Sequence, residues 1–74
     1  MTKEIQWKYS KVGRGYWLGY VNASSNASYR IIHNYVRGRW VAERLGMVNP
    51  ILESCCADLD EAKELCRLHA NGNA

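Results

Sequence analysis

Residues 58–69, with the sequence DLDEAKELCRLH, combine a helix start signal with helical periodicity. Asp58 followed three residues later by Glu61 is a capping box, in which the two side chains satisfy backbone N–H groups at the start of a helix. Residues 71–72, Asn-Gly, are typical of a helix end. Between these signals, the residues of one helical face are Leu59, Ala62, Leu65, Cys66 and His69. The segment predicts one amphipathic helix at the C-terminal end of the sequence.

The sequence upstream of this helix has features of β-strands. Polar and apolar residues alternate strictly over residues 4–9, which is the period of a half-buried strand. Residues 11–15 contain two glycines, which favour a turn because glycine readily adopts a positive φ. Residues 16–21 are rich in aromatic side chains that favour strands, and Gly19 indicates a bulge or a close approach of another backbone. A hairpin is expected here.

A second hairpin follows the polar segment NASSNAS, residues 22–28. Asn and Ser side chains bind neighbouring backbone groups and so compete with regular structure, which favours a loop. Residues 29–36 predict a third strand, and residues 40–45 predict a fourth. Between them, Arg-Gly-Arg at residues 37–39 predicts a tight turn. The polar segment is therefore interpreted as the loop between the two hairpins.

Residues 51–56 allow two interpretations. They form a short strand or, with Asn49 as cap and Pro50 at the first helical position, one or two helical turns; the strand is slightly favoured. The predicted class is α+β, with an antiparallel sheet of three to five strands and one C-terminal helix packed on one face. Because 74 residues are too few for a second core, residues 1–74 are expected to form a single domain.

The composition is that of a folded, mildly basic chain. The formal net charge is +3, which weakly favours polyanionic partners. Three Trp and five Tyr with no Phe favour surfaces that are partly buried and partly in contact with solvent or a partner. The chain shows no secretory signal and no long apolar stretch, so a cytoplasmic location without membrane association is expected. Glycosylation at the two N-A-S sequences is not expected for the same reason.

Metal binding and catalysis find little support in the sequence. Cys55, Cys56, Cys66 and His69 have metal-ligand side chains, but they lack the repeated C-x(2–4)-C spacing of structural zinc sites. Buried, reduced thiols are the simpler interpretation. No G-x-S-x-G or glycine-rich phosphate loop is present, so we expect neither an enzyme nor a cofactor.

Basic residues interleaved with aromatic residues on the second hairpin are the remaining functional signal. Guanidinium groups beside flat rings suit a hot spot for a protein partner, and they equally suit phosphate contact and base stacking. A third interpretation is that charges protect an edge strand from aggregation. The candidate partner-binding residues are Arg30, His33, Tyr35, Arg37, Arg39, Trp40 and Arg44.

Two resemblances bear on these residues. The sequence GRWVAE at residues 38–43, followed by DLDEAK at residues 58–63, resembles the ethylene-response-factor type of DNA-binding domain. That resemblance implies a sheet laid in the DNA major groove, with Arg39 and Glu43 facing DNA while Trp40 and Ala42 pack on the helix.

The second resemblance covers more of the chain. A Trp/Tyr-rich N-terminal meander, a Y-x-I strand, a G-x-W strand and a terminal L-x-E-A-K-x-x-C-x-x-H helix look like small accessory proteins of phages and prophages. Such proteins include inhibitors of host machinery, anti-CRISPR proteins among them, which act by occupying a surface.

The sequence therefore favours a small non-enzymatic binding module of phage or mobile-element type. Its expected partner is a host protein or ribonucleoprotein complex. The alternative is a sheet-mediated DNA-binding domain of integrase-arm or ethylene-response type. The oligomeric state is left open, a homodimer included.

Overall fold

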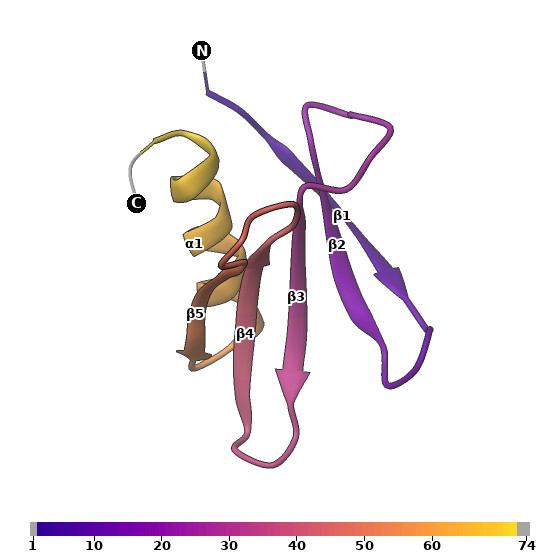
Figure 1. Ribbon diagram of the computed structural model, residues 1–74, viewed down its shortest axis with the longest axis vertical. Coiled ribbons are helices and arrows are strands. Elements are labelled where there is room, and N and C mark those ends of the chain that lie inside the picture. The colour runs from indigo at the N-terminus through magenta and orange to yellow at the C-terminus, as the bar shows by residue number, and fades with distance from the viewer. Residues whose placement is uncertain (1, 73–74) are drawn as a thin grey trace.

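The computed structural model describes residues 2–72 and contains, within them, one five-stranded sheet and one helix (Figure 1). The strands pair antiparallel in chain order. This architecture confirms the predicted α+β class, and residues 51–56 are a strand. The elements are β1 (Ile5–Ser10), β2 (Tyr16–Val21), β3 (Tyr29–Asn34), β4 (Arg39–Arg44), β5 (Ile51–Cys56) and α1 (Leu59–Ala70).

The helix begins and ends at the signals identified in the sequence. The Asp58 carboxylate accepts a hydrogen bond of 2.8 Å from the Glu61 N–H. The Glu61 carboxylate in turn accepts from the N–H of Ala57, one residue before the cap. Asn71 is the C-cap, and Gly72 follows with a φ of 75°. Among residues 2–72, no helix is long and apolar enough to cross a membrane.

The core lies between α1 and the face of the sheet that we call the inner face. Side chains alternate between the inner face and the opposite, outer face along each strand. The helix packs against β3, β4 and β5, and Figure 1 shows it on one side of that part of the sheet. The buried apolar side chains are Tyr29, Ile31, Ala42, Cys56, Ala62 and Cys66. A core this small makes each of its contacts important for stability.

The inner face of β1 and β2 lies beside the helix and is packed by its own aromatic residues. Trp7 is paired with Gly19 across the two strands. A Cβ atom on Gly19 would lie 2.8 Å from the Trp7 ring and 2.8 Å from Cγ2 of Ile5. The register of this hairpin is regular, so the expected bulge at Gly19 is wrong. The close approach is made by side chains instead of another backbone, because a ring can lie flat over a residue without a Cβ.

Substitution of Gly19 by Ala is predicted to destabilise the protein by about 1–3 kcal/mol, because Trp7 and Ile5 must move away from the new methyl group. Urea unfolding measures the cost. The same substitution in a Trp7→Leu background should cost less, since the bulky ring is gone. Equal costs in the two backgrounds would contradict this account of Gly19.

Candidate partner-binding surface

The seven candidate residues lie on the β3–β4 hairpin, but the structure distributes them over different parts of its surface. Arg30 is on the outer face, where its Nε donates a hydrogen bond of 2.7 Å to the Glu43 carboxylate. Its guanidinium carbon also lies 5.7 Å from the centre of the Tyr16 ring. Glu43 is only 9% exposed. Arg30 therefore serves mainly to neutralise a buried carboxylate, which would be costly to leave unpaired.

Arg44 lies on the inner face and holds loops together. Its guanidinium donates to the backbone carbonyls of Ser28 and Leu45, which belong to the two loops at this end of the sheet. The same group lies 5.4 Å from the centre of the buried Tyr29 ring. Burial raises the pKa of the Tyr29 hydroxyl, which hydrogen-bonds Nδ1 of His69 at 2.8 Å. The Arg44 side chain therefore stabilises the fold through these contacts.

His33, Tyr35 and Trp40 form an aromatic cluster. His33 and Trp40 are cross-strand partners with ring centres 4.5 Å apart, and the Tyr35 ring centre is 4.4 Å from that of His33. Trp40 also packs against the core. Tyr35 is 53% exposed, so the cluster leads from the core out to the surface of the β3–β4 turn.

Tyr35 connects this turn to the β1–β2 turn. Alternate turns of an antiparallel meander lie at the same end of the sheet, and Figure 1 shows both turns at its lower end. The Tyr35 hydroxyl donates a hydrogen bond of 3.2 Å to the carbonyl of Arg14, and the Arg14 guanidinium carbon lies 5.6 Å from the Tyr35 ring centre. We name this region the double-turn end; it consists of Lys11, Val12, Arg14, Tyr35, Val36, Arg37 and Arg39.

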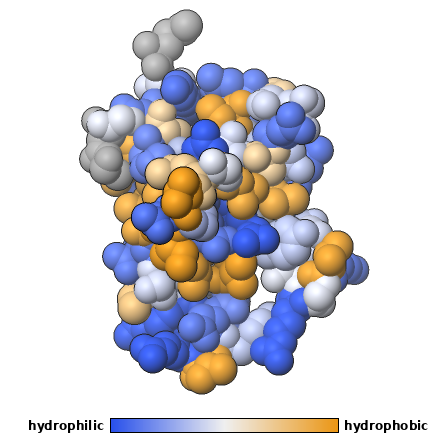
Figure 2. All heavy atoms as spheres, in the orientation of Figure 1, coloured by the Kyte–Doolittle hydropathy of each residue, from blue (hydrophilic) through white to orange (hydrophobic). Residues whose placement is uncertain are grey.

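The double-turn end presents aliphatic side chains among cations. Val36 is 92% exposed and Val12 is 68% exposed. Figure 2 shows hydrophobic atoms at the lower end of the molecule with hydrophilic atoms beside them. Exposed valines are ordinary singly, but aliphatic side chains, a half-exposed tyrosine and cations at one end of the sheet give the mixed apolar and charged surface that is typical of an interaction site.

The positive charges of this end have no acidic partner. Within residues 2–72 the ion pairs are Arg30–Glu43 and Glu64–Arg67, and neither involves the double-turn end. In the sequence, residues 5–42 contain six of the ten Lys and Arg residues and none of the seven Asp and Glu residues. The charge of the chain is therefore segregated, and its basic part includes both turns.

The β3–β4 turn is held in one conformation by Asn34. Its side-chain oxygen accepts hydrogen bonds from the N–H of Val36 at 3.1 Å and from that of Arg37 at 3.3 Å. Gly38 adopts a φ of 66° and donates to the Asn34 carbonyl at 2.8 Å. Val36 and Arg37 are thus presented on an ordered backbone.

Lys11, Val12 and Arg14 are not among the binding residues predicted from the sequence. The β1–β2 turn was recognised only as a turn, because its contact with Tyr35 joins residues far apart in the chain. Two signals in the sequence could have found it. One is the absence of acids from residues 5–42, and the other is the rule that alternate turns of a meander share an end.

The cysteines and His69 do not form a common site: Cys56 and Cys66 belong to the core, His69 binds the Tyr29 hydroxyl, and Cys55 lies at the surface. Cys56 and Cys66 are buried and Cys55 is exposed. Burial raises the pKa of Cys56 and raises that of Cys66 to about 12. Among the residues described, no three His, Cys, Asp or Glu side chains are grouped so that they could hold a metal ion.

Comparisons with protein-family models, with curated proteins and with solved structures found no match to this chain.

Stability is predicted to fall above pH 9 because of Cys66. Burial raises the pKa of its thiol from the ordinary value of 9.0 to about 12 in the folded protein. The unfolded chain therefore loses this proton first, and the stabilising contribution is complete below pH 9 and lost as the pH rises toward 12. Over this range, the difference of one proton lowers the free energy of unfolding by at most about 1.4 kcal/mol per pH unit.

Denaturant unfolding between pH 8 and pH 11 tests this prediction. The Cys66→Ala variant should show a shallower alkaline decline than the wild type, with a residual slope from Cys56 and Tyr29, whose pKa values are also raised. Parallel declines in the two proteins would show that Cys66 is not responsible.

Proposed function

We propose that this protein is a non-enzymatic binding module that uses the double-turn end to dock on a negatively charged surface of a protein or ribonucleoprotein, as an inhibitor or adaptor would. The observation that supports this proposal most directly is the pair of exposed valines, Val12 and Val36, which two separate hairpins hold among cations without acidic partners.

The exposed valines supply affinity in this proposal. Burying an exposed Val side chain contributes roughly 1.5–3 kcal/mol. Tyr35, which is half exposed, adds a ring of the kind that is common among binding hot spots. Because Asn34 and the Tyr35–Arg14 contact already order both turns, little further conformational entropy is lost on binding.

The cations supply orientation and speed. Lys11, Arg14, Arg37 and Arg39 would be attracted to an acidic patch, which raises the association rate and disfavours basic partners. Nucleic acid offers the same negative charge but makes little use of aliphatic side chains, since its phosphates are contacted by cations and its bases by rings and hydrogen-bonding groups. The valines therefore favour a protein surface as the principal contact.

Substitutions in the double-turn end are predicted to weaken partner capture. Tagged wild-type protein, Val36→Ser and Arg37→Glu are used to capture partners from a bacterial lysate after nuclease treatment, and the amount of the principal protein is measured. Each substitution should reduce it at least about tenfold, as expected for a contact worth more than about 1.4 kcal/mol.

Val48→Ser is the matched control, because Val48 is 97% exposed but lies in the loop between β4 and β5, at the opposite end of the sheet. It should capture as much partner as the wild type. Thermal unfolding of each variant verifies that the fold is retained. Equal capture by all four proteins would refute the proposed site. In a parallel capture from untreated lysate, recovery of nucleic acid that is lost with nuclease and falls steeply with salt would assign nucleic acid as the partner instead.

A further inference from the structure

The two edge strands of the sheet differ in how they are protected. At β5 the register with β4 shifts twice, Pro50 immediately precedes the strand, and the Glu53 carboxylate accepts hydrogen bonds from the N–H groups of Ser54 and Cys55. Irregular pairing, proline and charge are the features by which natural sheets prevent another strand from joining an edge. The β5 edge is therefore a poor template for a further strand.

The β1 edge has none of the irregularities found at β5. Its pairing with β2 runs over all six residues without a shift. Because the Asn22 N–H donates to the Glu4 carbonyl, the alternation of an antiparallel ladder turns the backbone groups of Gln6 and Lys8 toward β2. The N–H and carbonyl groups of Ile5 and Trp7 then point away from β2. They form an open edge.

Asn71 marks where this open edge begins. Its side-chain oxygen accepts a hydrogen bond of 2.7 Å from the Lys3 N–H, and its side-chain nitrogen donates to the Lys3 carbonyl at 3.2 Å. Both backbone groups of Lys3 are thus satisfied by the helix C-cap, in the way that a neighbouring strand would satisfy them. An added strand can pair with Ile5 and Trp7, and pairing would end at Lys3.

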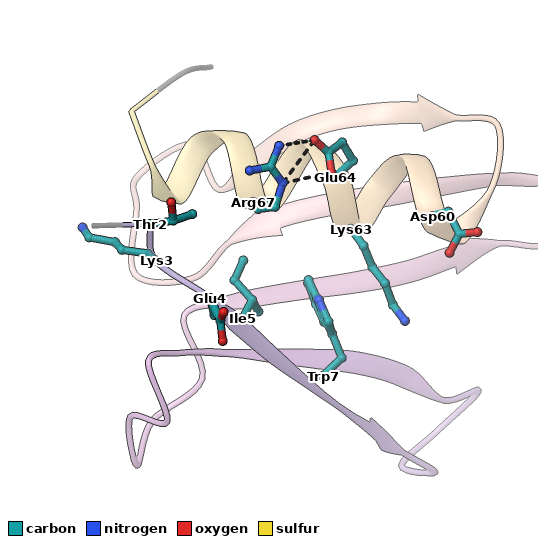
Figure 3. A pocket seen from close by; sticks show the side chains of 9 residues that line it. All are labelled: Thr2, Lys3, Glu4, Ile5, Trp7, Asp60, Lys63, Glu64 and Arg67. Carbon is teal, nitrogen blue, oxygen red and sulfur yellow. Dashed lines mark hydrogen bonds and ion pairs between the residues drawn. The ribbon is translucent and has the colours of Figure 1, made fainter.

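A cleft of about 440 Å³ lies between β1 and α1. Ile5 and Trp7 contribute its apolar lining, and Figure 3 shows both side chains extending from β1 toward the helix. The helix lines the other side with Asp60, Lys63, Glu64 and Arg67. Side chains of a strand added at the β1 edge would have this space available on the inner face.

We propose that the occupant of this edge is β1 of a second copy of the chain, paired antiparallel about a two-fold axis at Gln6. In this register Ile5 lies opposite Trp7, and the two residues exchange backbone hydrogen bonds across the axis. Glu4 lies opposite Lys8, and the symmetry produces this pair twice. Opposite charges directly across two strands stabilise their pairing.

Charge complementarity selects both the partner and the register. Neither Glu4 nor Lys8 takes part in the ion pairs found within residues 2–72, and the Lys8 ammonium lies 5.4 Å from the centre of the Tyr20 ring on the same strand pair. A shift by two residues places Trp7 opposite itself, but it sets Glu4 against Ser10 and loses the charge pairing. This interface is separate from the double-turn end and does not depend on the function proposed for it.

Reciprocal charge reversal tests the dimer. Sedimentation equilibrium of the wild type should show a monomer–dimer equilibrium. Glu4→Lys and Lys8→Glu should each raise the dissociation constant at least about tenfold, since each places like charges opposite one another at both pairs. An equimolar mixture of these two variants should form a heterodimer, which native mass spectrometry detects, because opposite charges then face each other again. The protein with both substitutions should dimerise like the wild type.

Lys11→Glu is the matched control, since it makes the same change of charge beyond the paired residues, and its dissociation constant should stay within about threefold of the wild-type value. A wild-type chain that remains monomeric at about 1 mM overturns the proposal. So does a dimer whose stability is unaffected by both reversals, or a mixture of the two variants that forms no heterodimer.

Discussion

The contact between α1 and the inner face of β3 and β4 is the interaction on which the rest of the structure depends. Ile31 and Ala42 of the sheet meet Ala62 and Cys66 of the helix, and all four are fully buried. Three of these side chains are small, so the helix can lie close to the strands. The cap at Asp58 fixes where the helix starts, and therefore which of its residues face the sheet.

A helix of twelve residues cannot cover five strands, and this limit explains the unusual aromatic composition. The β1–β2 hairpin is packed by rings at the margin of the core: Trp7 lies over Gly19, Trp17 contacts Tyr9, and the Lys63 ammonium lies 4.6 Å from the Trp17 ring centre. Such residues are buried on one side and meet water on the other. Trp and Tyr suit this position better than Phe because their polar atoms can remain solvated.

Periodicity and capping were sufficient to predict the class of the fold and the presence of each strand and of the helix. The turn expected at residues 37–39 lies instead at residues 35–38, so Tyr35 and Val36 belong to the turn and Arg39 begins β4. Periodicity and capping also could not predict how the candidate residues divide between the two faces, because the segment from Tyr29 to Tyr35 shows no strict alternation of polar and apolar residues. Arg30 and Arg44 therefore looked like surface cations, although the first pairs with a buried carboxylate and the second with loop carbonyls. The register between strands determines these contacts, and it depends on the whole sheet.

The double-turn end contributes no residue to the buried core. Its conformation depends on Asn34 and on glycines such as Gly38, whereas Val12, Val36 and Arg37 only project from it. Substitutions at these projecting positions leave the folding energy nearly unchanged, so they can accumulate without loss of the domain. The surface of this end can then change while the framework beneath it stays the same, in the way that loops diversify on an unchanged immunoglobulin framework.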